Sequence, residues 1–316
     1  MTTLSVIIVS YNTREDTEAC IASVFGNAPA DTQVIVVDNG STDGTAAAIR
    51  DRFPGVIVDE ANENLGFARG VNRGVAQADG DYIVLLNPDT VVLTDGLMAL
   101  VAFARQHPEN GVYGGRTERR DGSVERSSCW GAPTLWSLFC FATGLSTAFR
   151  GSAVFDPESL GRWQRDSVRE VPIVTGCLLL MRREDWNALG GMDETFFLYG
   201  EDAEFSIRAA RHGWRPVIVP EAAVIHDVGG STSVSTQKMS LVLAGKTTLL
   251  RHVWSPRRAR AGCALLLAGV GLRTVLERAR GRRDGTWGVA WRRRSDWLAG
   301  YPSAKHTLFG IPPVAA

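Results

Sequence analysis

Hydrophobic positions follow two patterns in the first third of the chain. Four short runs rich in β-branched residues predict buried strands at residues 4–10, 33–38, 56–59 and 82–86. Apolar residues at helical spacing predict helices at residues 13–25, 44–53, 67–78 and 95–106. Because these strands and helices alternate, we expect an α/β fold with a mostly parallel central sheet. The strands are almost continuously apolar, as expected where helices cover both faces of a sheet.

The pattern is less regular after residue 106. The predicted elements are a hairpin at Asp121-Gly122, one buried strand at 171–181, a helix at 201–212, and two short strands at 215–219 and 222–226. Residues 127–170 are rich in aromatic side chains, and no regular element is predicted there. Beyond residue 231 the chain is predicted to be mainly helical.

Charge divides the chain into two parts, although the net charge is zero. Residues 1–234 contain 19 basic and 31 acidic residues, whereas residues 235–316 contain 15 basic and 3 acidic residues. An acidic part suits metal binding, and a basic part suits anionic lipid headgroups or diphosphates. Nucleic acid would also fit the basic part, but the sequence contains no motif typical of a nucleic-acid-binding domain.

Polar residues gather where three of the predicted strands end. These residues are Ser10-Tyr11-Asn12, Asp38-Asn39-Gly40-Ser41 and Asn87-Pro88-Asp89. In parallel sheets, ligands bind beyond the carboxyl ends of the strands. Asp38 could accept hydrogen bonds from a nucleobase or ribose, or its loop could simply connect a strand to a capped helix. Asp89 could bind Mg²⁺ or Mn²⁺ with a diphosphate, since these ions take oxygen ligands, or it could belong to a plain turn.

Three glycines recur every four residues, one just before the third predicted helix and two within it. Glycine costs a helix up to about 1 kcal/mol per residue, so Gly66, Gly70 and Gly74 require a reason. Close approach to a ligand is one reason, and tight packing against another element is the other. The polar residues beside them could meet a phosphate or lie in solvent: Arg69, Asn72 and Arg73.

Two more polar groups follow residue 190. Glu201, Asp202 and Glu204 begin a predicted helix, where they could complement its dipole or supply a general base toward a hydroxyl. His226 ends a predicted strand and could be structural or a metal ligand.

Taken together and in this order, these motifs resemble family 2 glycosyltransferases with the GT-A fold, in particular bacterial rhamnosyltransferase-like members. The resemblance covers about residues 4–231. It implies a Rossmann-like, mostly parallel central sheet flanked by helices, with a helical C-terminal appendage. The domains it implies are a catalytic domain at 1–231, with a nucleotide-sugar half at about 1–115 and an acceptor half at about 116–231, and a basic helical region at 232–316.

The resemblance also implies roles for single residues on the donor side. Asp38 would bind the nucleobase, with Ser10 and Tyr11 in the same pocket. Asp89 matches the last acid of the family's Asp-x-Asp element, and Asn87 replaces the first acid. The residues that would surround the ribose and diphosphate are Asn64, Gly66, Arg69 and Asn72.

For the reaction, the resemblance implies a metal-dependent inverting transfer. His226 would join Asp89 as a ligand of Mg²⁺ or Mn²⁺, and Asp202 would be the catalytic base. Glu201 and Gly176 would lie on the acceptor side. The expected donor is dTDP-L-rhamnose, with UDP-galactofuranose and other UDP-hexoses as alternatives. The expected acceptor is a hydroxyl of a glycan or of a polyprenyl-diphosphate-linked sugar in cell-envelope polysaccharide synthesis.

The basic region predicts a membrane contact. Four tryptophans and several paired arginines flank the short apolar run 264–272, as in helices that lie on a membrane surface. A helical appendage that packs on the catalytic domain or forms a homodimer is the alternative. No apolar run reaches the roughly 18 residues of a membrane span, and the first residues predict a strand rather than a signal peptide. With five cysteines and no C-x-x-C pair, we expect a cytoplasmic protein, peripheral at the inner face of the cell membrane.

Two rival functions are weighed against this one. A nucleotidyltransferase would need a glycine-rich basic loop after the first strand, where this chain has Ser10-Tyr11-Asn12. A catalytically inactive nucleotide-sugar-binding scaffold would not need Asp89, Asp202 and His226 together.

Overall fold

The computed structural model describes residues 3–226, 235–282 and 284–309. The chain divides into two compact units. The first contains Met1–Trp130, Gln164–Met192 and Phe205–Ser231, and the second contains Gly131–Trp163, Asp193–Glu204 and Thr232–Ala316. The expected boundary at residues 231 and 232 lies outside the described residues.

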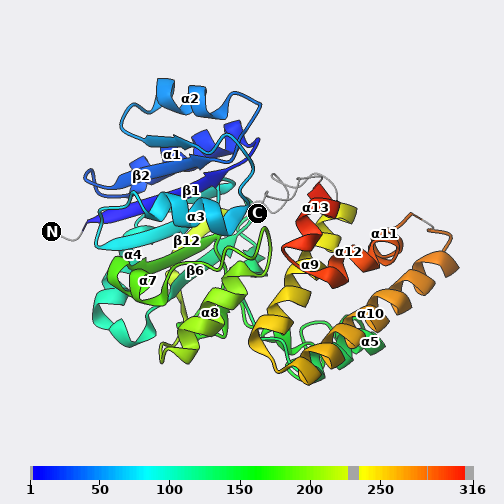
Figure 1. Ribbon diagram of the computed structural model, residues 1–316. Helices are drawn as coiled ribbons and strands as arrows, with labels where there is room; N and C mark the ends of the chain where they lie inside the picture. Colours follow the sequence, from blue (N-terminus) through cyan, green and yellow to red (C-terminus); the bar gives the residue numbers. More distant parts are fainter. Residues whose placement is uncertain (1–2, 227–234, 283, 310–316) are drawn as a thin grey trace. The chain divides into compact units, whose positions relative to one another are not determined.

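A mixed, mostly parallel sheet is the centre of the first unit (Figure 1). Its strand order is β3-β2-β1-β4-β11-β6-β12-β5, with β7 beside β6 and β9 beside β12. β11 lies antiparallel between β4 and β6, and β5 is antiparallel to β12. The strands are β1 (Leu4–Ser10), β2 (Gln33–Asp38), β3 (Ile57–Glu60), β4 (Tyr82–Leu86), β5 (Thr90–Val92), β6 (Tyr113–Glu118), β7 (Val124–Glu125), β9 (Arg169–Glu170), β11 (Leu178–Arg182) and β12 (Val217–His226).

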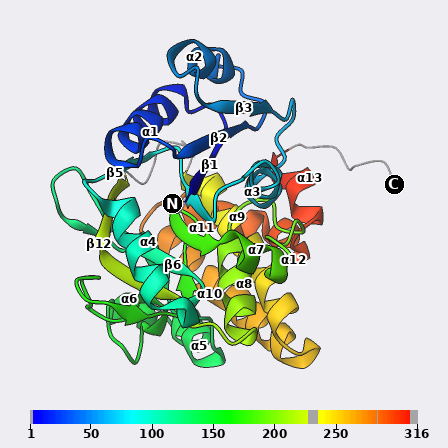
Figure 2. The ribbon, with the colours of Figure 1, turned by 90° about the vertical axis from the view of Figure 1, so that its left-hand side faces the viewer.

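Helices cover both faces of this sheet, as the apolar strands predict. Side chains of α1, α2 and α4 share one core with Val6 and Ile8 of β1, whereas α3 packs on Ile7 and Val9 of the same strand. Figure 2 shows α1 and α4 on one side of the sheet and α3 and α7 on the other. The helices are α1 (Arg14–Asn27), α2 (Thr45–Arg52), α3 (Phe67–Val75), α4 (Gly96–Gln106), α7 (Arg183–Leu189) and α8 (Glu201–Arg211), of which the first unit contains the part from Phe205 onward, with short 3₁₀ helices at Pro108–Asn110 and Arg126–Ser128.

Two strand predictions are wrong. The run 171–181 is not one strand, because β10 (Ile173–Val174) leaves the main sheet and pairs with β8 (Cys129–Trp130). The chain is diverted between β10 and β11, where the Thr175 hydroxyl donates to the Ser127 carbonyl at 2.8 Å. The two strands expected after residue 214 are instead one strand, β12, with a register shift between Val219 and Ala223. Pro220 lies in this shift, where its missing N–H breaks the ladder.

The repeated glycines of α3 are explained by packing. A Cβ at Gly70 would lie 2.8 Å from Val9 Cγ1, and a Cβ at Gly74 would lie 2.6 Å from Ile7 Cγ2. Gly66 precedes the helix with a positive φ of 80°. Two of the three glycines therefore let the helix backbone approach the sheet closely, and the third makes the turn that enters the helix.

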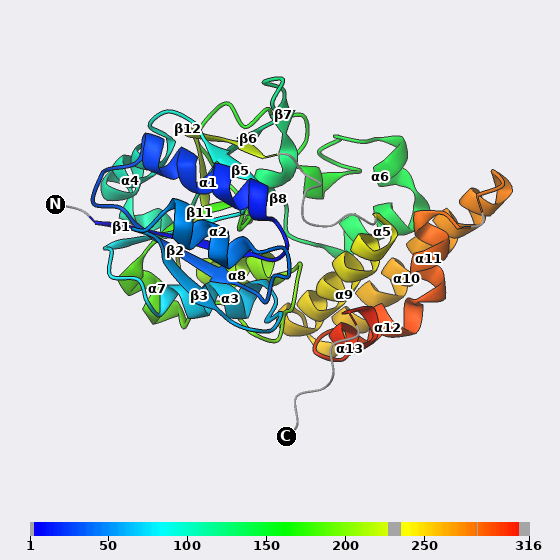
Figure 3. The same cartoon turned by 90° about the horizontal axis from the view of Figure 1, so that it is seen from above.

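The second unit is mainly helical (Figure 3). Its elements are α5 (Leu135–Thr143), α6 (Leu145–Ala148), a 3₁₀ helix at Pro157–Ser159, α9 (Ser235–Val253), α10 (Pro256–Ala279), α11 (Thr286–Arg292), α12 (Arg294–Ala299) and α13 (Ser303–Phe309). A capping box of Thr134 and Ser137 begins α5. α5 packs along α10, whose small residues Gly262 and Gly269 face Leu138 and Phe141.

Helix α10 is longer than the apolar run from which the sequence predicts no membrane span. It has 24 residues and contains an 18-residue window with a mean hydropathy of 1.5. It is long and apolar enough to cross a membrane by length and composition alone, whereas the apolar run read from the sequence covers about half a span. Of this window 44% is buried inside the fold, and the core helix of a protein without membrane spans passes the same test of length and composition.

Candidate functional site

The first two strand ends of the sheet are joined by a network of loop hydrogen bonds. Ser10 and Asp38 are opposite each other in the parallel register of β1 and β2. Beyond them, the Asn12 side chain accepts from the Thr42 amide at 2.7 Å, and Asp38 accepts from the Ser41 amide at 2.8 Å. These bonds hold the two loops together, so Asp38 is buried and oriented by its own turn.

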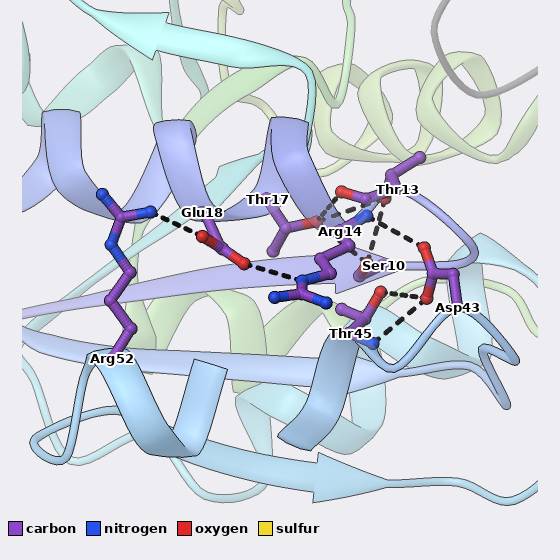
Figure 4. Close-up of polar contacts among 8 residues, drawn as sticks. All are labelled: Ser10, Thr13, Arg14, Thr17, Glu18, Asp43, Thr45 and Arg52. Atoms are coloured by element: carbon purple, nitrogen blue, oxygen red, sulfur yellow. Dashed lines mark hydrogen bonds and ion pairs between the residues drawn. The ribbon is translucent and has the colours of Figure 1, made fainter. Parts of the chain in front are cut away.

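A second carboxylate, Asp43, fastens the same two loops (Figure 4). It accepts from the Arg14 amide at 3.1 Å and from the Thr45 amide at 3.1 Å. Burial raises the pKa of Asp43, but the hydrogen bonds from Thr45 and Arg14 outweigh it, so the pKa lies below the usual range. Asp43 therefore stays ionised as a structural link.

Ser10 and Tyr11, which were expected to share the nucleobase pocket, point in different directions. The Ser10 hydroxyl is fully buried and lies 3.0 Å from the hydroxyls of both Thr13 and Thr17 (Figure 4). It is therefore directed to the start of α1. Tyr11, the next residue, is exposed. Of this pair, Tyr11 is the side chain that a ligand can reach.

The loop that enters α3 packs against the loop after β2. Asn64 accepts from the Gly66 amide at 3.0 Å, and the Asn39 amide nitrogen donates to the Gly66 carbonyl at 2.9 Å. Asn39 is buried, and its side-chain oxygen has no hydrogen-bond partner among the described residues. No role for Asn39 was expected from the sequence, although its place between Asp38 and Gly40 marks the same turn.

Two polar residues of α3 are engaged in structural contacts. The Asn72 side chain donates to the Met192 carbonyl at 2.9 Å and accepts from the Met192 amide at 2.9 Å. Arg73 pairs with Asp59 through two bonds, at 2.8 and 2.6 Å, and this pairing lowers the pKa of Asp59. Arg69, on the same helix, is half-buried.

The turn that Asn72 holds is also held by α8. Gly190 and Gly191 both have positive φ, and Arg208 donates to the Gly191 carbonyl at 2.8 Å. A Cβ at Gly191 would lie 2.8 Å from Asn72 Oδ1. This glycine pair is therefore required for the turn that leads to Asp193.

Asp89 and His226 form the expected pair. Asp89 Oδ1 lies 3.4 Å from His226 Nε2, and their side chains are only 8% and 9% exposed. They meet because His226, the last residue of β12, pairs with Thr90 of β5. His226 Nδ1 lies 3.3 Å from the Ser127 hydroxyl, which orients the ring. The Asn87 carbonyl, not its side chain, closes the turn by accepting from Thr90 N at 3.2 Å.

This pair fits a divalent cation that also binds a diphosphate. Within the described residues, no group of three or more His, Cys, Asp and Glu could hold a metal ion. Mg²⁺ bound with a nucleotide diphosphate commonly takes one or two protein carboxylates, and the remaining ligands are phosphate oxygens and water. One carboxylate and one imidazole are therefore a sufficient donor set.

Gly176, expected on the acceptor side, is buried between β10 and β11 in the first unit. A Cβ there would lie 2.9 Å from the ring of Phe67, the first residue of α3. Only glycine leaves room for this ring.

In the second unit, Glu201 and Asp202 begin α8. Glu201 is 5% exposed, and its Oε2 atom has no hydrogen-bond partner among the described residues. Burial, followed by the nearby charge of Asp202, raises the pKa of Glu201 to about 8. Asp202 is half-buried and accepts from the Ala203 amide at 2.7 Å. The two neighbouring acids therefore have different surroundings.

The segment before α8 is closely packed on α9. Tyr199 and Gly200 have positive φ, and the Tyr199 carbonyl lies against Gly245, where even a Cβ would not fit. The Tyr301 hydroxyl donates to the Leu198 carbonyl at 2.7 Å. These contacts with α9 and with Tyr301 fix the position at which α8 begins with Glu201 and Asp202.

Comparisons with known proteins agree with this architecture. Residues 5–185 match Glycosyl transferase family 2, and residues 140–311 match Glycosyl transferase family group 2. The N-acetylglucosaminyl-diphospho-decaprenol L-rhamnosyltransferase of Mycobacterium tuberculosis is 30% identical over 247 residues, which are 72% of this chain and 77% of that protein. The poly-beta-1,6-N-acetyl-D-glucosamine synthase of Staphylococcus aureus is 28% identical over 53% of this chain and 43% of its own length.

Solved structures share the fold at low sequence identity. GalNAc-T7 with UDP, GalNAc and Mn²⁺ superposes with a TM-score of 0.60 at 15% identity, over 96% of this chain and 58% of that longer chain. The mannosyltransferase PcManGT from Pyrobaculum calidifontis, in complex with GDP-Man and Mn²⁺, gives 0.52 at 18% identity, over 98% and 88%. The expected GT-A fold is confirmed, and the chain belongs to glycosyl transferase family 2.

Proposed function

We propose that this glycosyltransferase moves L-rhamnose from dTDP-L-rhamnose to a hydroxyl of a polyprenyl-diphosphate-linked glycan, with inversion and with a divalent cation. The observation that carries the proposal is the buried Asp89–His226 pair at the strand ends of a family 2 sheet. The choice of donor and acceptor rests on the mycobacterial relative, whose printed name specifies a rhamnosyltransferase and a decaprenol-linked sugar.

On the donor side, Tyr11 and Asp38 would meet the nucleobase and ribose. Tyr11 is exposed beyond β1, and Asp38 is held in a fixed turn beyond β2. Arg69 would offset negative charge on the diphosphate. Asn72 would act indirectly, because its amide is already bound to the Met192 backbone.

Asp89 and His226 would hold Mg²⁺ or Mn²⁺. When bound, the cation would supply Lewis-acid stabilisation of the negative charge on the leaving diphosphate. Imidazole is a better ligand for transition metals than for Mg²⁺, so His226 favours Mn²⁺.

Asp202 would take the proton of the acceptor hydroxyl. As the hydroxyl oxygen bonds to the anomeric carbon, the bond from that carbon to the diphosphate oxygen breaks on the opposite face. A single displacement of this kind inverts the anomeric configuration. Asp202 suits a base better than Glu201, because burial favours the protonated form of Glu201.

A donor panel tests the proposal. Release of nucleoside diphosphate is measured from dTDP-L-rhamnose, UDP-galactofuranose and UDP-hexoses, with a polyprenyl-diphosphate-linked N-acetylglucosamine acceptor. We expect release from dTDP-L-rhamnose only, abolished by EDTA and restored by Mn²⁺. Release from a UDP-sugar would replace the proposed donor. No release, together with no metal-dependent binding of dTDP or UDP, would overturn the enzymatic assignment in favour of an inactive scaffold.

Membrane placement follows from the acceptor. A polyprenyl-diphosphate-linked sugar stays at the bilayer surface, so we propose that the enzyme works at the membrane, and the cysteine content favours its cytoplasmic face.

A further inference from the structure

The second unit carries a cluster of exposed hydrophobic side chains on α5 and the segment after it. Of the thirteen exposed large hydrophobics in the described part of the chain, five lie within residues 135–154, each 40–58% exposed. Single exposed apolar residues are common on any protein, whereas a group marks a binding surface. We call this group the α5 patch; it consists of Leu135, Trp136, Phe139, Phe149 and Val154.

Contacts among its side chains make the patch continuous. The Trp136 ring lies 5.6 Å from Phe139 and 6.2 Å from Phe155, and Phe155 lies 5.0 Å from Phe149. The Trp136 indole donates to the Val154 carbonyl at 2.7 Å. The aromatic rings are therefore held in place before any partner binds, which lowers the entropy cost of binding.

The tryptophans of the basic region, which the sequence places on either side of the apolar run 264–272, are half-buried or buried. Trp297 is fully buried and donates to the Ala290 carbonyl at 2.8 Å. Trp287 packs beside Phe141 and under the Arg273 guanidinium, and Trp291 packs on Gly271. Among the described residues of this unit, the exposed aromatic side chains are therefore Trp136, Phe139 and Phe149 and not these tryptophans.

Charge around the α5 patch favours an anionic partner. Both acids of its segment are satisfied inside the fold: Glu158 pairs with Lys246 at 2.5 Å, and Asp156 accepts from the Gly151 amide at 2.8 Å. Three exposed arginines have no carboxylate partner among the described residues: Arg150, Arg278 and Arg280. Arg150 follows Phe149 directly.

Helix α10 contacts α6 next to the α5 patch, and Arg278 and Arg280 follow this contact along the chain. Arg273 of α10 donates to the Thr147 hydroxyl at 2.9 Å, two residues before Phe149. Val275 and Leu276 on the next turn are also exposed. Apolar side chains flanked by arginines are the composition of a surface that lies in the headgroup region of a bilayer.

We propose that the α5 patch binds the surface of an anionic phospholipid membrane, with its apolar side chains at the acyl boundary and the flanking arginines at the headgroups. A second copy of the chain fits less well. A symmetric contact would place two surfaces with the same flanking arginines against each other, and this like charge disfavours association. The proposal does not depend on which sugar is transferred.

Vesicle flotation of the full chain tests the proposal without donor or acceptor. Vesicles of phosphatidylcholine alone are compared with vesicles that also contain phosphatidylglycerol. The test variant is Phe139→Ser/Phe149→Ser, and the matched control is Phe25→Ser, an equally exposed phenylalanine on α1. We expect the wild type and the control to float with the anionic vesicles. The partition coefficient of the test variant should be lower by about tenfold or more. Melting temperatures verify that the variants are folded.

Three outcomes would overturn the proposal. The wild type could fail to bind anionic vesicles, or the test variant could bind as well as the control. In the third outcome, analytical ultracentrifugation would find that the wild type is a dimer and the test variant a monomer. The α5 patch would then be an interface between copies of the chain. Nucleoside diphosphate release in the same samples reports on the proposed function separately.

Discussion

At the scale of single residues, the two acids that begin α8 are expected to behave differently. Replacing Asp202 with Asn keeps the size of the side chain and removes the base. We expect turnover to fall by about 10²–10⁴-fold, the usual contribution of a positioned base. Donor binding, measured by calorimetry, should stay within about twofold of the wild type. Glu194→Gln removes a nearby exposed carboxylate and should retain near wild-type turnover; an equal loss in both variants would contradict the assignment.

Glu201 predicts a dependence of stability on pH. Its pKa is about 8 in the folded protein and 4.5 when unperturbed. Between these values the folded state holds the proton and the unfolded state releases it, so the free energy of unfolding decreases as pH rises from 4.5 to 8. The slope from this group is at most about 1.4 kcal/mol per pH unit. Glu201→Gln should remove it, so melting curves at pH 5 and pH 8 should show the variant gaining stability relative to the wild type at pH 8. A difference that does not change with pH would argue against a protonated Glu201.

The Asp89–His226 pair predicts metal affinity that depends on both side chains. We expect Asp89→Ala and His226→Ala each to weaken Mn²⁺ binding in the presence of dTDP by about tenfold or more. Titration calorimetry measures this without turnover. His107→Ala is the control, because it removes a 45% exposed imidazole that contacts Glu109 and Phe103 and lies outside the proposed metal site. Unchanged Mn²⁺ affinity in both site variants would remove the pair as the metal site.

At the scale of elements, α3 and α1 offer matched glycine substitutions. A methyl group at Gly74 would meet Ile7 Cγ2 at 2.6 Å, whereas one at Gly26 would meet nothing within 4 Å. We expect Gly74→Ala to lower the free energy of unfolding by about 1–3 kcal/mol, because it forces the helix from the sheet. Gly26→Ala should instead raise it by about 0.4–1 kcal/mol. Urea denaturation of both variants measures the difference, and equal effects would refute the packing explanation.

Local patterns predict the elements whose surroundings are uniform. β1, β2 and β4 have the predicted bounds because helices cover both of their faces, so nearly all of their residues are buried and most are apolar. β10 and β12 differ from the predicted strands. A turn separates β10 from β11 within one apolar run, and Pro220 lies inside β12; hydrophobic periodicity does not show where strand pairing changes.

The site residues that could not be predicted are those whose contacts lie far away in the sequence. The motif order gives Asp89 and His226, whose pairing follows from strand ends. No local pattern shows that Asn72 binds Met192, which is 120 positions away, or that Trp297 is buried. Side chains that join distant segments are therefore the part of the site that required the structure.

At the scale of the whole molecule, charge segregation matters more than the net charge of zero. A chain with evenly mixed charge would be indifferent to an anionic surface, but residues 235–316 contain 15 basic and only 3 acidic residues. Exposed charges are screened over about 10 Å at 0.1 M salt and about 3 Å at 1 M. Binding to phosphatidylglycerol vesicles should therefore weaken by about tenfold or more between 0.05 and 0.5 M NaCl.

The apolar share of that binding should respond differently to salt. Contact of the α5 patch with the acyl boundary is hydrophobic, so salt does not screen it. The wild type should keep weak binding at 0.5 M NaCl, and Phe139→Ser/Phe149→Ser should lose it. Arg278→Gln/Arg280→Gln should show the opposite behaviour, with weaker binding at low salt and wild-type binding at high salt. If both variants lost binding in parallel at every salt concentration, aromatic and basic side chains would not contribute separately, and the surface would have to be assigned elsewhere.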